Sequence, residues 1–113
     1  MTNLKIATLL IFSMGIGFLA SCGSAKTPSE INLSAAQAKY PGYGMAAFTA
    51  GQNLYTANCG RCHPAYTPNS HTEEQWAKWV PKMVTMANKN AKTVVIDEPG
   101  QELILKFLYA ASH

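Results

Sequence analysis

Cys59-Gly60-Arg61-Cys62-His63 is the stretch of sequence on which the fold depends. Two thiols that are separated by two residues and followed at once by an imidazole have the spacing of a covalent haem attachment site. Each thiol can add across one vinyl group of the porphyrin, and the imidazole is then held beneath the iron as its proximal ligand. The motif therefore predicts one haem c, held by Cys59, Cys62 and His63 through two thioethers and one iron–nitrogen bond.

Other uses of a Cys-x-x-Cys pair fit the surrounding sequence less well. A thioredoxin-like redox pair belongs in a strand–helix–strand context, and no such pattern surrounds residues 59–63. A zinc site needs further thiolate or imidazole ligands, and the remaining candidates are Cys22, His71 and His113. A disulfide across two intervening residues closes so small a loop that it stabilises little.

The first 21 residues have the pattern of an export signal. Lys5 supplies a positive charge, and Ile6 to Leu19 is an apolar stretch too short for a transmembrane helix, which takes about 20 apolar residues. Leu19-Ala20-Ser21-Cys22 resembles a bacterial lipobox, in which the chain is cut before the cysteine and the thiol is diacylated. We expect residues 1–21 to be a lipoprotein signal peptide and Cys22 to carry the lipid. The alternatives are an ordinary signal peptide or an uncleaved anchor with an incidental cysteine.

This signal sequence predicts a lipid-anchored protein on the periplasmic side of the bacterial cell envelope. Gly23 and Ser24, directly after Cys22, include no acid that would indicate retention at the inner membrane, so the outer membrane is slightly favoured. The assignment also accounts for all 3 cysteines, two for haem and one for lipid, and leaves none for a disulfide.

Length and charge limit the partners and the size of the core. Removing the signal leaves a chain of about 90 residues, which is one small domain and a tether. So short a chain buries little core alone, and we expect the haem to supply part of the interior. The formal net charge of +3 is mild, and no basic run indicates nucleic acid. Four lysines would share much of one helix side, either as a solvated face or as a docking surface for an acidic redox partner: Lys78, Lys82, Lys89 and Lys92.

The chain after the signal divides into a lead-in and a domain. Residues 22–45 are expected to be a tether and lead-in, in which Pro41, Gly42 and Gly44 argue against a continuous helix. Residues 32–39 are compatible with a short helical turn. Residues 46–113 are expected to form the folded domain.

Two helices are predicted on either side of the motif. The composition of residues 46–58 favours a helix with an apolar face, and residues 64–70 are expected to be a loop. Thr72, with Gln75 three positions later, has the pattern of a capping box and predicts a helix over residues 73–90. Pro81 predicts a kink or a break near residues 79–81, because proline removes a hydrogen bond and clashes one turn back.

A last helix is predicted to begin at Asp97-Glu98-Pro99, where acids and proline suit the first turn. Its apolar stripe is expected to pack on the first helix around Gly51 and Tyr55, and consists of Leu103, Ile104, Phe107, Leu108 and Ala111. Residues 93–96 are expected to form a loop that packs against the haem, with a short strand as the alternative.

These patterns together resemble small single-haem class I cytochromes c over residues 48–109. Gly51-x-x-Leu54-Tyr55-x-x-x-Cys59-x-x-Cys62-His63 looks like the first helix and haem site of that family, and Ile104-x-x-Phe107-Leu108 looks like its C-terminal helix. Trp76-x-x-x-Val80-x-x-Met83 is similar to a subgroup in which a Trp-led helix carries a methionine after the motif. The resemblance implies an all-α cytochrome c fold, with three to four helices wrapped around one covalently bound haem.

The sixth iron ligand has several candidates. Met83 matches the spacing of the subgroup best, and Met86 lies three residues further on. His71 would give a bis-His site, whereas Met45 precedes the motif. The chain lacks the glycine-rich loop that delivers the methionine in better-known members, so the choice stays open. His113 is expected to be free.

Other groups are expected to position or enclose the haem. His63 would bind iron through Nε2 while its Nδ1–H donates to a backbone carbonyl within residues 64–68. Four aromatic side chains are expected to wall the pocket: Tyr55, Tyr66, Trp76 and Trp79.

The expected function is electron transfer by a monomeric, membrane-anchored cytochrome that is not itself an enzyme. Its partners would be redox proteins, such as a dehydrogenase or a terminal oxidase or reductase. The alternative is a haem-based sensor or small-ligand-binding module, in which the sixth coordination position is open or displaceable.

Overall fold

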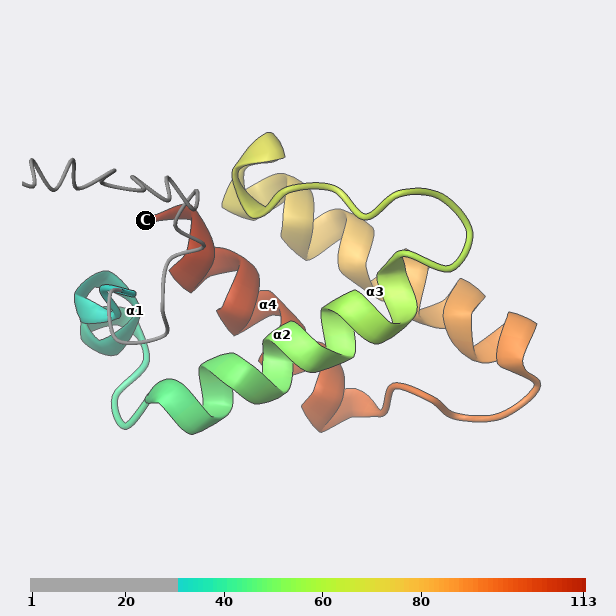
Figure 1. Cartoon of the computed structure of the whole chain (residues 1–113), viewed down its shortest axis with the longest axis horizontal. Coiled ribbons are helices and arrows are strands. Elements are labelled where there is room, and N and C mark those ends of the chain that lie inside the picture. The colour runs from blue at the N-terminus through green and yellow to red at the C-terminus, as the bar shows by residue number, and fades with distance from the viewer. Residues whose placement is uncertain (1–30) are drawn as a thin grey trace, which may run out of the picture.

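The computed structural model describes residues 31–113, which form an all-α domain (Figure 1). Its elements are α1 (Ser34–Lys39), α2 (Met45–Cys59), a single 3-10 turn η2 (Pro68–Ser70), α3 (Glu73–Ala91) and α4 (Glu98–Ser112). This part of the chain contains no strand. The predicted signal peptide and Cys22 lie outside the described residues. None of the helices within residues 31–113 combines the length and the apolar character that crossing a bilayer requires.

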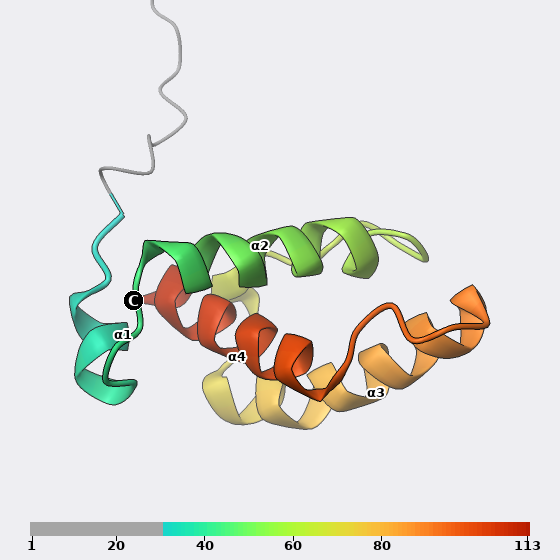
Figure 2. The same ribbon diagram turned by 90° about the horizontal axis from the view of Figure 1, so that it is seen from below.

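Helix α4 is the central element. It packs most extensively along α2 and also contacts α1, α3 and η2. Figure 2 shows α2 and α3 on opposite sides of α4. The predicted close crossing is confirmed at Gly51, which is buried directly against the backbone of Leu103. A glycine is needed there because a larger residue would have to push the two helices apart.

The core lies between α4 and its neighbours. Ile104 and Leu108 of α4 and Val80 of α3 are its largest fully buried side chains. Phe107 meets Phe48 edge to face, with ring centroids 5.2 Å apart, and lies 5.7 Å from the ring of Tyr55. Such aromatic pairs add to the stabilisation from buried apolar area.

The predicted stripe of α4 is confirmed except at its end. Ile104, Phe107 and Leu108 are buried and Leu103 is half-buried, but Ala111 is exposed and Ala110 is buried instead. Ala110 and Ala111 follow Phe107 by three and four positions, so they lie on opposite edges of the same apolar stripe. The elements that pack on α4 cover the edge with Ala110 and leave Ala111 exposed. The expectation for Ala111 was therefore wrong.

Helix α3 begins as predicted but does not break. Thr72 caps it with a complete capping box in which the Thr72 side chain accepts from the Gln75 amide and the Gln75 side chain accepts from the Thr72 amide. The helix continues through Pro81, so the break allowed near residues 79–81 does not occur. An internal proline costs roughly 3 kcal/mol. Burial of Val80 and Val84 against the core, on either side of the proline, offsets this cost.

The segment before α2 contributes to the core instead of serving only as a lead-in. Leu33 and Ala36, at α1, and Tyr43 are buried, and α1 packs on α4. Folded structure therefore starts before residue 46, the expected beginning of the domain. Helix α1 matches the short helical turn allowed over residues 32–39, but its 6 residues have too short a periodicity to indicate that the segment would be buried.

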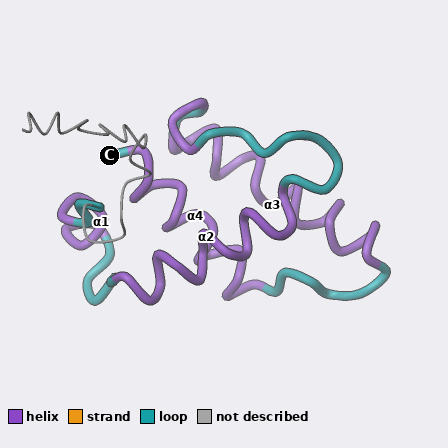
Figure 3. The backbone as a smooth tube through the Cα atoms, viewed as in Figure 1, coloured by secondary structure: helices purple, strands orange, loops and turns teal. Residues whose placement is uncertain are grey.

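Two loops connect the long helices, as Figure 3 shows. The first carries the motif and runs from the end of α2 to η2. The second spans residues 92–97 and is a loop, as expected for 93–96. Asn88 holds it, accepting from the amides of Val95 and Ile96 at 2.9 and 3.0 Å and donating to the Ile96 carbonyl at 2.8 Å.

Candidate functional site

The end of α2 places the two thiols of the motif. Cys59 is the last residue of the helix and is half-buried, whereas Cys62 lies in the turn that follows and is exposed. Both thiols are free. Burial raises the pKa of Cys59 to about 11, so this thiol stays protonated at neutral pH. Asn90 of α3 donates to the Cys62 sulfur at 3.6 Å, which brings α3 beside the motif.

His63 has its ring fixed by its neighbour. Its Nδ1 lies 2.9 Å from the carbonyl oxygen of Pro64. A carbonyl can only accept, so Nδ1 carries a hydrogen, and in the neutral ring Nε2 keeps its lone pair. This contact matches the carbonyl partner expected within residues 64–68 and identifies it as Pro64. An imidazole held in this tautomer is prepared to bind a metal through Nε2.

A hollow of about 200 Å³ lies between the motif loop and α3; we call it the motif hollow. His63 lines it on one side, and Met83 and Met86 line it from α3. A second, smaller hollow of about 40 Å³ joins the same three residues to Cys59 and Cys62. The fold thus brings both candidate methionines to the motif, although they follow His63 by 20 or more positions in the chain. The motif hollow is lined by His63, Tyr66, His71, Trp76, Trp79, Met83 and Met86.

The other proposed ligands separate into two groups. His71 also lines the motif hollow, so it stays a candidate. Met45 and His113 do not line either hollow at the motif. Met83 is half-buried and Met86 is exposed, which makes Met83 the better shielded thioether.

Exposed apolar surface is concentrated at the motif hollow. Among the described residues, four large apolar side chains are exposed, and three of them line this hollow: Tyr66 at 49%, Trp79 at 46% and Met86 at 54%. The fourth, Val94, lies in the loop after α3. Clustered exposed apolar groups mark a place where a ligand or partner covers them. The expected walls Tyr66, Trp76 and Trp79 are therefore at the hollow.

Tyr55 has a different position from the one expected. It is buried in the core and does not line the motif hollow. Its hydroxyl donates to the Tyr66 carbonyl at 2.6 Å, and burial raises the pKa of this phenol to about 12. Tyr55 thus anchors the loop that carries His63.

A second anchor holds the same loop through Pro68. The carbonyl of Pro68 accepts from the Trp76 indole at 2.8 Å and from the Ser112 hydroxyl at 3.0 Å. Neither Ser112 nor Asn88 was singled out from the sequence. Their partners are backbone carbonyls and amides far along the chain, and no local pattern indicates such contacts.

Comparison with known proteins gave no match: no protein-family model, no curated protein and no solved structure is similar to the chain. Within residues 31–113, no three His, Cys, Asp or Glu side chains are grouped so that they could hold a metal ion. The loop of residues 93–96 does not line either hollow at the motif.

Proposed function

We propose that this protein is a single-haem c-type cytochrome that carries electrons one at a time and is not itself an enzyme. The observation that carries the proposal is the meeting of His63 with Met83 and Met86 at one hollow, beside two free thiols. The four helices would then be the small cytochrome c fold that the motif resembles. When bound, the haem iron supplies a couple between the ferrous and ferric states.

The residues at the motif fit haem c. Cys59 and Cys62 offer two thiols for thioether bonds, and His63 offers Nε2 because its Nδ1–H is committed to Pro64. The motif hollow of about 200 Å³ is smaller than ligand pockets of roughly 300–1,000 Å³. Tyr66 and Trp79, which line it, have exposed side chains, so the hollow is bordered by groups that are not held in the core.

Met83 is the distal ligand that we favour. It lines both hollows at the motif and is half-buried, so its sulfur is partly shielded from water. A Met/His pair raises the reduction potential, whereas His71 as the ligand would lower it. The Met83 thioether and the His63 imidazole would both hold the iron, so a change of its valence would need little rearrangement, which suits electron transfer.

A haem-based sensor of small ligands is the second candidate. The exposure of Met86 and Trp79 favours it, because an open hollow gives a small molecule access to a weakly held sixth position. In both candidates Cys59, Cys62 and His63 have the same roles. They differ only in how firmly the sixth position is held.

The exposed lysines support a redox partner with an acidic surface. Lys78, Lys82 and Lys89 are exposed on α3, and Lys92 is exposed at its C-terminal cap. Lys82 Nζ lies 5.1 Å from the ring centre of Trp79, which lines the motif hollow. Complementary charge would raise the rate of encounter with a dehydrogenase or a terminal oxidase or reductase. We propose a monomer held on the periplasmic side of the envelope through a lipid on Cys22, with the outer membrane favoured.

The first test is whether the haem is covalent. Protein matured with haem should keep its colour after acid–acetone extraction and on a denaturing gel. The double variant Cys59→Ala/Cys62→Ala should release all of it. Colour that is extracted from the unaltered protein would overturn the proposal.

The second test distinguishes the two candidates. The visible spectrum of the reduced, haem-loaded protein is recorded before and after adding carbon monoxide. An unchanged spectrum indicates a firmly held sixth ligand and supports electron transfer. A rapid and complete shift indicates an open position and supports ligand binding.

A further inference from the structure

His63 lies in a stretch of chain that has little cover. Every residue from 60 to 67 is exposed, and none of them belongs to a helix. Two contacts fix the ring of His63 in this loop, one with the Pro64 carbonyl oxygen, 2.9 Å from Nδ1, and one with the ring of Tyr66. The carbonyl belongs to the adjacent residue, so it moves with His63 and cannot by itself relate the imidazole to the rest of the fold.

Tyr66 supplies the contact that reaches the helices. Its ring centroid lies 5.1 Å from that of His63 and also 5.1 Å from that of His71. The His71 ring in turn lies 4.7 Å from the ring of Trp76, which is 3% exposed. A continuous run of rings thus leads from the motif loop to the buried face of α3; we call it the ring run, and its members are His63, Tyr66, His71 and Trp76.

The backbone of the same loop is held by polar contacts. The hydroxyl of Tyr55, which is 4% exposed, donates to the Tyr66 carbonyl at 2.6 Å. The Trp76 indole donates to the Pro68 carbonyl at 2.8 Å. Tyr66 is therefore tied to two different helices, with its backbone bonded to α2 and its ring joined to α3 through the ring run. Tilted and edge-to-face ring pairs of this kind attract each other beyond the burial of their area.

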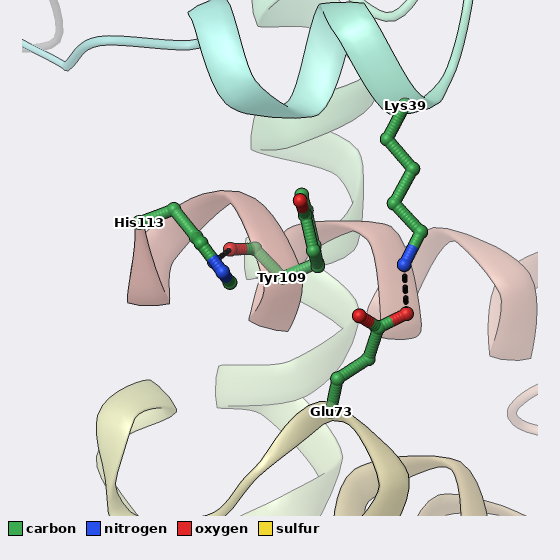
Figure 4. Close-up of polar contacts among 4 residues, drawn as sticks. All are labelled: Lys39, Glu73, Tyr109 and His113. Carbon is green, nitrogen blue, oxygen red and sulfur yellow. Dashed lines mark hydrogen bonds and ion pairs between the residues drawn. The ribbon is translucent and has the colours of Figure 1, made fainter.

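A second imidazole in the fold is held by the same two kinds of contact. His113 Nδ1 donates to the Tyr109 carbonyl at 2.8 Å, and the two rings stack with centroids 4.2 Å apart. Figure 4 shows this pair close to the ion pair of Lys39 and Glu73. The carbonyl fixes the direction of Nδ1, and the tyrosine ring restricts rotation of the imidazole about that hydrogen bond. At His63 the same two parts come from two neighbouring residues.

We propose that Tyr66 is the residue that positions the proximal imidazole. Its ring keeps the plane of His63 fixed, so that the Nδ1–H stays on the Pro64 carbonyl. With that bond closed, Nε2 of the neutral ring stays available to the iron. The contact is made by the ring of Tyr66, so phenylalanine should replace tyrosine without loss. This inference rests on the proposed function, because the role of Tyr66 is exerted on His63 as an iron ligand.

Hydrogen exchange of the His63 Nδ1–H tests the role of Tyr66. It is measured by NMR in the full-length, haem-loaded, reduced protein under carbon monoxide, which is diamagnetic whether the sixth ligand is firmly held or displaced. Tyr66→Leu removes the ring and should speed exchange at least about fivefold, because the bond to Pro64 opens more often. Tyr66→Phe keeps the ring and should stay within about twofold of the unaltered protein.

The direction of the imidazole plane is a second readout, which a loss of stability alone would not move. In the oxidised protein, the spread of the porphyrin methyl resonances depends on the angle of that plane. Tyr66→Leu should change this spread, and Tyr66→Phe should restore it.

Trp79→Leu is the matched control for the exchange rate. Trp79 is 46% exposed and lines the same motif hollow as Tyr66, which is 49% exposed. Within residues 31–113 the ring that packs on His63 is that of Tyr66 and not that of Trp79. Trp79→Leu should therefore leave exchange of the His63 Nδ1–H within about twofold of the unaltered protein.

Tyr55→Phe tests the anchor of Tyr66 and supplies the same measurement should Tyr66→Leu not take up haem. It keeps a ring in the core but removes the bond to the Tyr66 carbonyl. The motif loop then opens more often, and exchange of the His63 Nδ1–H should rise about threefold.

Unchanged exchange in Tyr66→Leu, or in Tyr55→Phe where Tyr66→Leu is not loaded, would overturn the role of Tyr66. Acceleration in Tyr66→Phe or Trp79→Leu equal to that in Tyr66→Leu would overturn it as well. Covalent attachment of the haem is measured separately by extraction. Colour lost on extraction overturns the proposed function, whereas retained colour with unchanged exchange overturns only the positioning by Tyr66.

Discussion

A β-carbon placed on Gly51 would overlap the carbonyl oxygen of Leu103 and would lie 2.8 Å from the β-carbon of Phe107. Real β-carbons do not approach backbone so closely, so α2 and α4 can cross at this distance only with glycine at position 51. This contact sets how deeply Phe107 reaches between the helices.

Gly51→Ala should therefore destabilise the protein. The nearest atom is backbone and cannot move aside alone, so the cost should reach at least the 1–3 kcal/mol or so that is typical of overpacking. Alanine raises helix propensity, and this gain of about 1 kcal/mol will be outweighed. Denaturant unfolding followed by circular dichroism measures the change.

Gln52→Ala is the matched control, because its side chain is exposed on the same helix. It should stay within about 0.5 kcal/mol of the unaltered protein. Equal stability of the two variants would contradict the close crossing.

Tyr43 and Tyr55 should respond in opposite ways to the loss of their hydroxyls. The Tyr43 hydroxyl is buried without a hydrogen-bond partner, so Tyr43→Phe should be neutral or stabilising by up to about 1 kcal/mol. Tyr55→Phe loses the bond to the Tyr66 carbonyl and should cost about 1 kcal/mol. Thermal unfolding of the two variants side by side measures the difference, and a stabilised Tyr55→Phe would contradict the anchoring role.

Stability should fall at high pH. Burial raises the pKa of both Tyr43 and Tyr55 to about 12, whereas a phenol in the unfolded chain titrates near 10. Above pH 10 the unfolded chain holds fewer protons than the folded one, so the free energy of unfolding declines as pH rises. The part of the decline that these two phenols cause should begin near pH 10 and level off near pH 12.

The same two variants check this pH dependence. Each should flatten the decline over pH 10–12, since each removes one phenol that folding keeps protonated. If the free energy of unfolding falls as steeply in Tyr43→Phe and Tyr55→Phe as in the unaltered protein, groups other than these two phenols cause the pH dependence.

Met83→Ala should lower the reduction potential of the haem-loaded protein and let carbon monoxide bind. A shift on the order of 0.1 V is a small part of the roughly 0.8 V over which axial ligands set haem potentials. Potentiometric titration with visible spectroscopy measures both effects. Met86→Ala, three residues along the same helix, is the control and should change the potential less. An unchanged spectrum in Met83→Ala would move the ligand to Met86 or His71.

Cys22→Ala should release the exported protein from membranes. Each buried methylene of a lipid chain contributes about 0.8 kcal/mol, so losing two acyl chains removes the anchor. Cell fractionation and immunoblotting follow the shift from the membrane pellet to the soluble fraction. Cys62→Ala changes the same residue type outside the lipobox and should stay in the pellet. Continued membrane association of Cys22→Ala would argue against the lipobox.

Local sequence predicted whatever depends on neighbouring residues. The capping box at Thr72, the start of α4 at Asp97 and the contact of His63 with a nearby carbonyl each involve groups at most a few positions apart. Periodicity likewise identified α2 and the buried face of α4, because a helix repeats its own pattern along the chain. Cys59, Cys62 and His63 lie within five consecutive residues, so their spacing can be recognised without knowledge of the fold.

Tertiary structure decided what depends on distant partners. The folded position of Tyr55, the burial of Ala110 in place of Ala111 and the continuity of α3 through Pro81 follow from which elements cover which faces. Sequence periodicity says that a face is apolar but not what lies against it. The approach of Met83 to His63 arises because α4 holds the other elements in place. Contacts between residues far apart in the chain have no local sequence pattern, so only the folded arrangement specifies them.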